Sequence, residues 1–248
     1  MSDLNRNTAS GYANATRAEA GYVDEGLRSF LLRVYNYMAI GLAVTGVAAF
    51  GTAAMAVSNG QLTSFGYALY ASPLKWVIML APLGFVFFLS ARINSMSVGA
   101  AQMTFWAFAA VMGLSMSSIF LVFTGESIAR VFFLTAATFG AMSLYGYTTK
   151  RDLSGMGSFL FMGLIGIIIA SIVNIFIGSS AIQFAVSVIG VLIFTGLTAY
   201  DTQQIKEMYY VGDDGTVAGR KAISGALRLY LDFINLFMML LQLFGNRE

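Results

Sequence analysis

Long apolar runs, separated by short polar segments, dominate the chain from residue 34 onward. Most of them are long enough to cross a hydrocarbon core of ~30 Å, because an α-helix rises ~1.5 Å per residue. The pattern therefore predicts an all-α fold, a polytopic membrane protein built as a seven-transmembrane-helix bundle. The helices are expected at residues 34–57, 74–91, 98–123, 128–149, 156–178, 181–205 and 223–244.

The first 30 residues differ from the rest in being polar and mixed in charge. They lack the charged start, short apolar core and small-residue cleavage site of a signal peptide. We therefore expect residues 1–30 to form a flexible cytoplasmic tail and residues 31–248 to form the transmembrane domain.

Composition supports a membrane protein and excludes several chemistries. The chain is 58% apolar and 10% charged, whereas a soluble domain carries about 25% charged residues. The net charge of +2 and the lack of a basic cluster argue against nucleic acid as a partner. There is no cysteine and no histidine, so disulfides and thiolate metal sites are excluded. Any pH sensing near neutrality must then rely on carboxylates.

Positive charges alternate between the two sets of loops. The loops after the first, third and fifth predicted helices carry almost none. Because cytoplasmic loops are enriched in Lys and Arg, we expect a multi-pass protein of the cell membrane with a cytoplasmic N-terminus. The charges that define this side are Arg28, Arg33, Arg92, Lys150, Arg151, Lys206, Arg220 and Lys221.

The last apolar run is unlike the others. As a helix, residues 229–244 would be only ~24 Å long, and they include Asp232, Asn235 and Gln242. Such a segment is too short and too polar to face lipid. We expect it to be buried in protein, either as a central helix surrounded by the other six or as a re-entrant helix.

Two aspartates interrupt the apolar runs at the C-terminal end of the chain. Asp201 lies five residues before Lys206, so it is ~7–8 Å inside its helix, and Asp232 lies four residues, or ~6 Å, after Arg228. If Lys206 and Arg228 mark the interface, both carboxylates reach a similar depth on neighbouring helices. Charges at membrane depth are costly and usually functional. The spacing predicts one shared ion or proton site.

Two close carboxylates in a low dielectric share a proton. Protonated, the pair is a hydrogen-bonded latch; deprotonated, it repels itself and attracts cations. Calcium prefers six to eight oxygen ligands, and Asp201, Asp232 and Asn235 supply only part of that set, which favours transient binding in a permeation path. Arg228 can pair with Asp232, and Arg92 with Asp201 if their helices are adjacent. A purely structural ion pair is the alternative.

Four segments resemble the Bax inhibitor-1 family, most closely its bacterial branch: Ala199–Gln203, Leu229–Asn235, Thr148–Ser154 and Ile172–Asn174. The resemblance runs from about residue 28 to the end. It implies seven helices with the last one central, and a pH-sensitive calcium leak channel. The family's paired aspartates correspond to Asp201 and Asp232, and its locking arginine to Arg92. Calcium is implied as the permeant ion, with no cofactor.

A second function remains open. Bacterial members of this family include a modulator of a membrane-bound ATP-dependent protease, and the tail could make that interaction while the aspartates are structural. An enzyme is not expected, because there is no histidine, cysteine, Walker motif or nucleophile elbow. The resemblance implies the bacterial inner membrane as location, with lipid and calcium ions as the main partners.

Overall fold

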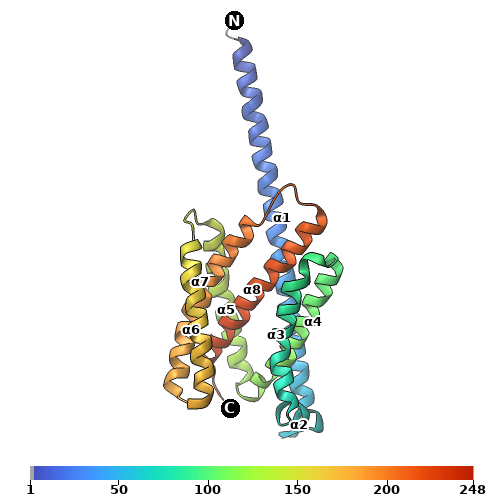
Figure 1. Ribbon diagram of the computed structural model, residues 1–248, viewed down its shortest axis with the longest axis vertical. Coiled ribbons are helices and arrows are strands. Elements are labelled where there is room, and N and C mark those ends of the chain that lie inside the picture. The colour runs from blue at the N-terminus through green and yellow to red at the C-terminus, as the bar shows by residue number, and fades with distance from the viewer. Residues whose placement is uncertain (1–2, 248) are drawn as a thin grey trace.

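The computed structural model describes the backbone of residues 3–247 and the side-chain surroundings of residues 25–247. This part of the chain is an all-α bundle (Figure 1), and seven of its helices are long and apolar enough to cross a membrane. The predicted fold class is confirmed. The long helices are α1 (Asp3–Ala56), α3 (Leu74–Arg92), α4 (Val98–Met116), α5 (Gly125–Thr148), α6 (Ser154–Ile177), α7 (Ser180–Glu207) and α8 (Gly215–Phe244).

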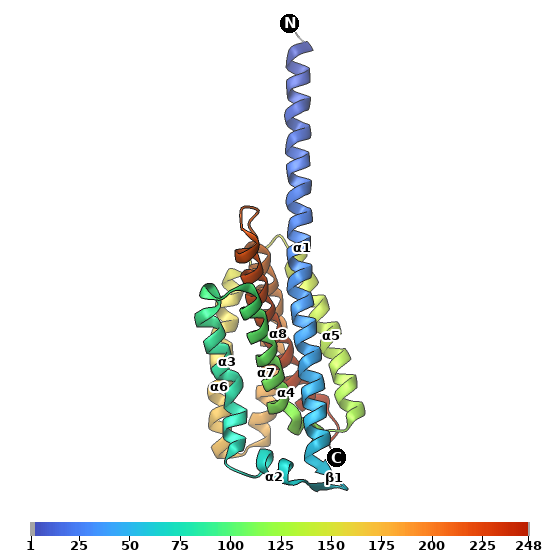
Figure 2. The ribbon, with the colours of Figure 1, turned by 90° about the vertical axis from the view of Figure 1, so that its right-hand side faces the viewer.

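Helix α1 extends well beyond the bundle at its N-terminal end (Figures 1 and 2). Its part from Glu25 to Ala56 is long and apolar enough to cross a membrane, and it overlaps the first predicted helix, residues 34–57. Residues 3–24, expected to form a flexible tail, continue the same helix. Their flexibility in solution stays a prediction.

The segment between α1 and α3 is more ordered than a plain loop. A tight hairpin of β1 (Val57–Ser58) and β2 (Gln61–Leu62) turns at Asn59 and Gly60, whose φ angles are 52° and 74°. Two positive φ angles in a two-residue hairpin suit the Asn-Gly pair. A short helix, α2 (Ser64–Tyr70), follows, and two 3₁₀ turns, η1 (Ile93–Ser95) and η2 (Ser117–Leu121), follow α3 and α4.

Helix α8 is the centre of the bundle. It crosses diagonally behind α3 and α6 in Figure 1 and packs against α1, α4, α5 and α7. In its apolar stretch 56% of the residues are buried, compared with 17–39% in the other six spans. The prediction of a central last helix is confirmed.

The central helix is also longer than its apolar run. It has 30 residues, or ~45 Å at ~1.5 Å per residue, so it is long enough to cross the bilayer. The extra length lies at its start, where Oδ1 of Asp214 accepts hydrogen bonds from the backbone N–H groups of Thr216 (2.8 Å) and Val217 (2.7 Å). This N-cap satisfies donors that a helix start leaves free.

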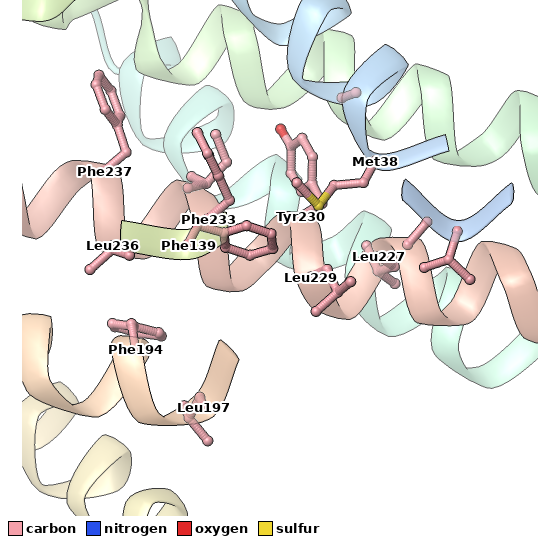
Figure 3. Packing of buried hydrophobic residues seen from close by; sticks show 14 of the residues in the cluster. Met38, Phe139, Phe194, Leu197, Leu227, Leu229, Tyr230, Phe233, Leu236 and Phe237 are labelled. Carbon is pink, nitrogen blue, oxygen red and sulfur yellow. The ribbon is translucent and has the colours of Figure 1, made fainter. Parts of the chain in front are cut away.

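Two faces of α8 have different surroundings. Tyr230, Phe233 and Phe237 follow a spacing of three and four residues, which places them on one side of the helix, and Figure 3 shows them in the apolar core. Tyr230 packs edge-on against the rings of Phe105 and Phe108, at centroid distances of 5.8 and 5.4 Å. The opposite side carries the polar residues of the last helix.

Candidate functional site

A cavity of about 770 Å³ lies between α3, α6, α7 and α8. Most of its wall is apolar, and its polar residues come almost entirely from α7 and α8. Both predicted aspartates are among them, so the structure brings Asp201 and Asp232 to one cavity. The other polar residues of this wall are Ser171, Tyr200, Arg228 and Asn235.

Asp232 is the most buried charged residue of the cavity, with only 5% of its surface exposed. It lines the same cavity wall as Asp201, which lies on the neighbouring helix α7. Its Oδ2 atom is buried and has no hydrogen-bond partner among the described residues. Because an unsatisfied buried oxygen is destabilising, stability alone does not account for it. A shared proton or a bound cation would satisfy this oxygen.

Arg228 is the cation nearest to the aspartates. Its Nη1 lies 3.9 Å from Oδ1 of Asp201, and its side chain is 48% exposed, against 17% for that of Asp201. Sequence spacing suggested a pair with Asp232 on the same helix, but the structure directs the guanidinium across to α7. At this distance and exposure the ion pair is weak.

The other two predicted site residues differ in position. Asn235 lines the cavity, and its Nδ2 donates to the backbone oxygen of Leu231 at 2.8 Å. Its side-chain oxygen is therefore the atom that can act as a ligand. Arg92 ends α3 and is exposed, and it is not one of the residues that line the cavity. A locking role for Arg92 stays a prediction.

Polar residues that follow Asp201 fix the end of α7 to its neighbours. The hydroxyl of Thr202 lies 3.0 Å from that of Ser143 on α5. The side chain of Gln203 accepts from the backbone N–H of Leu153 (2.8 Å) and donates to the backbone oxygen of Arg151 (2.9 Å). These bonds hold α7 against α5 and the loop before α6. Because Asp201 is next to Thr202 in the chain, these hydrogen bonds also fix where Asp201 lies in the cavity wall.

A second polar cluster lies nearer the other end of α6, α7 and α8, and it was not predicted. Gln183 donates to Gln242, whose oxygen also accepts from Ser187 at 3.0 Å. Asn174 contacts Gln183 at 3.5 Å. Gln242 is ten residues, or ~15 Å, along α8 from Asp232. The sequence held one sign of this cluster: Gln183 and Ser187 are four residues apart and so lie on the same face of their helix.

These features define a multi-pass helical membrane protein with a carboxylate site inside its bundle. The family model described as "Inhibitor of apoptosis-promoting Bax1" matches residues 27–248. The chain belongs to this family, the Bax inhibitor-1 family. The predicted resemblance is confirmed.

Bacterial relatives match nearly the whole chain. The inner membrane protein YbhL of Escherichia coli is 48% identical over 225 residues, which cover 90% of this chain and 94% of that protein. The uncharacterized protein RP147 of Rickettsia prowazekii is also 48% identical over 225 residues, covering 91% and 92%. An uncharacterized protein of Caulobacter vibrioides is 45% identical over 254 residues and covers both chains fully.

Proposed function

We propose that the protein is a pH-sensitive cation leak channel that conducts calcium, with Asp201 and Asp232 as its gate and proton sensor. One observation carries the proposal: Asp201 and Asp232 line one cavity inside a membrane bundle, and Oδ2 of Asp232 is buried there without a hydrogen-bond partner among the described residues. A charge at the centre of a membrane helix costs about 2.5–3.5 kcal/mol on insertion scales. A site that keeps two such groups together suits a function that protonates and deprotonates them.

The proton shared by the pair defines two states. With the proton present, the two carboxyl groups hydrogen-bond and hold α7 and α8 together. Without it, two negative charges repel each other and attract a cation. In this proposal cation flux rises as pH rises through the titration of the pair. One shared proton limits the change to about tenfold per pH unit.

Calcium fits this site as a passing ion. Asp201, Asp232 and Asn235 offer oxygen atoms on one cavity wall. No group of three or more acidic, histidine or cysteine residues suited to a metal occurs within the described residues. Calcium prefers six to eight oxygens, so water must complete its shell, and such binding is weak enough for release. Arg228 places a competing positive charge beside Asp201 and disfavours cation entry until it moves.

The proposal also covers location and class. The relative YbhL is named an inner membrane protein, which supports the bacterial inner membrane for this chain. The distribution of Lys and Arg among the loops supports an N-terminus in the cytoplasm. No enzymatic role is proposed.

The test is calcium flux into dye-loaded proteoliposomes at several pH values. Wild-type flux is expected to depend on pH, and Asp201→Asn or Asp232→Asn is expected to remove most of that dependence. Asp152→Asn is the matched control, since this carboxylate accepts a hydrogen bond from the backbone N–H of Ser154 in a loop outside the cavity. Absence of flux at every pH, from folded and inserted protein, would overturn the proposal.

A second candidate function is regulation of a membrane-bound ATP-dependent protease. The N-terminal part of α1 supports it, because this helix projects beyond the bundle and offers a surface to a partner (Figure 2). Deletion of residues 1–24 is expected to abolish such an interaction and leave calcium flux unchanged. The reverse result, lost flux with retained interaction, would contradict this division of roles.

A further inference from the structure

The cavity that contains the aspartates opens sideways toward the bilayer. α3 contributes only Leu83 to its wall, whereas α6 contributes a row of mostly apolar side chains. Two members of that row, Phe161 and Ile175, are 60% and 72% exposed. In a membrane these surfaces meet hydrocarbon rather than water. An apolar chain can therefore enter the cavity between α3 and α6.

A second cavity continues the first toward the start of α8. It measures about 360 Å³ and shares Arg228 and Leu231 with the larger one. Its wall adds Arg220 and Lys221, and none of its lining residues carries a carboxylate. This end of the groove is basic. Basic pockets between membrane helices on the cytoplasmic side are typical sites for anionic lipid headgroups.

The three cations of this basic end are not equally available. Arg220 donates at 2.6 Å to the backbone oxygens of Asn94 and Met96, and Lys221 pairs with Asp213 at 2.5 Å. Arg228 is held only by the 3.9 Å contact to Asp201 and is half exposed. Its guanidinium is the cation best placed to bind a phosphate, which it can meet with two parallel hydrogen bonds.

The larger cavity is about as long as one leaflet is thick. Arg228 and Met239 are its outermost residues on α8 and are eleven residues apart, or ~16 Å along the helix axis at ~1.5 Å per residue. Half of a ~30 Å hydrocarbon core is ~15 Å. A lipid whose phosphate lies at Arg228 would have its acyl chain alongside the cavity to the middle of the membrane.

We propose that this groove binds an anionic phospholipid of the leaflet on the basic side, the side predicted to be cytoplasmic. The phosphate contacts Arg228, with Arg220 and Lys221 adding positive charge, and one acyl chain lies between α3 and α6 over the aspartates. The phosphate then competes with Asp201 for Arg228. This site goes beyond the proposed ion flux and does not require it.

The experiment is native mass spectrometry of the full chain in detergent, with phosphatidylglycerol or phosphatidylcholine bearing identical acyl chains. Preferential retention of phosphatidylglycerol is expected. Arg228→Gln should weaken its binding about fivefold, the effect of one cation near an anionic lipid. Arg92→Gln is the matched control, because Arg92 is on the same side but lines neither cavity.

A second pair of variants tests the acyl-chain part of the groove. Ile168→Trp fills the cavity and is expected to reduce binding of both lipids. Its neighbour Ile169 is exposed and does not line the cavity, so Ile169→Trp should bind like wild type. If Ile168→Trp does not fold, Ser171→Leu narrows the same cavity. Equal retention of both lipids by wild type, or equal effects within either matched pair, would overturn the proposal.

Discussion

At the scale of single residues, Thr45 and Tyr230 form a polar joint in the core. The hydroxyl of Thr45 lies 2.6 Å from that of Tyr230 and 2.9 Å from the backbone oxygen of Ala109. The three residues belong to α1, α8 and α4. Both side chains are buried, at 4% and 0% exposure. This joint fixes the face of α8 opposite to the aspartates, so it helps to set where the aspartates point.

We predict that Thr45→Val and Tyr230→Phe each destabilise the protein and that their effects are not additive. Each change leaves the other hydroxyl without one partner. Interhelical hydrogen bonds in membranes contribute about 0.6 kcal/mol on average and at most about 1.7, so the coupling energy should fall in that range. Thermal or denaturant unfolding of the two single variants and the double variant measures it.

The control for this cycle is Thr148→Val. Thr148 is exposed at the end of α5, and its hydroxyl bonds only within its own helix. Its change should stay within about 0.5 kcal/mol. Fully additive effects of Thr45→Val and Tyr230→Phe would show that the joint contributes nothing.

At the scale of elements, the contact between α5 and α7 depends on one glycine. A Cβ atom at Gly146 would lie 2.2 Å from the backbone oxygen of Ala199. No side chain fits there without moving α7. Ala199 comes two residues before Asp201, so this close approach also positions the carboxylate.

We predict that Gly146→Ala destabilises the protein by about 1–3 kcal/mol, the usual cost of overpacking. Gly140→Ala on the same helix is the control, because a Cβ there meets nothing within 4 Å. It should leave stability unchanged or slightly raised, since alanine favours helix more than glycine. Unfolding midpoints in detergent compare the two. Equal unfolding midpoints for Gly146→Ala and Gly140→Ala would show that α7 shifts to accommodate the added methyl group at no cost in stability.

Sequence patterns predicted the helices well because the length of each apolar run is set by bilayer thickness. They failed where polar residues extend a helix beyond that run. Residues 215–222 contain Arg220 and Lys221, yet they form the first turns of α8, since Asp214 caps them and Arg220 anchors them to the loop after α3. Residues 3–24 likewise continue α1.

Sequence spacing pointed to Asp201 and Asp232 as neighbours, but it did not give the partner of Arg228. Depth along each helix, read from Lys206 and Arg228, suggested that Asp201 and Asp232 share a level. Rotation of each helix about its axis is decided by packing, which spacing does not encode. That rotation decides two features of the site. It directs Arg228 to Asp201 instead of Asp232, and it sets the sideways opening of the cavity.

At the scale of the whole molecule, the predicted orientation can be tested directly because the chain contains no cysteine. Ser58 and Ser95 are exposed and lie at opposite ends of the bundle, after α1 and after α3. In intact cells a membrane-impermeant maleimide is expected to label Ser58→Cys but not Ser95→Cys. After permeabilisation it should label both. The opposite pattern would place the N-terminus outside.

The central place of α8 also has a consequence for biogenesis. The ribosome completes α1 to α7 before α8, so the helices that line the middle of the bundle enter the membrane without the element that they surround. Surfaces around Phe105, Phe108 and Phe139, which finally contact Tyr230 and Phe233, must meanwhile face lipid or one another. The other helices can already pack on one another, as α1 does on α4 and α7 does on α5 and α6. The core around α8 is completed only when the last helix, with its two-sided surface, is inserted among the other six.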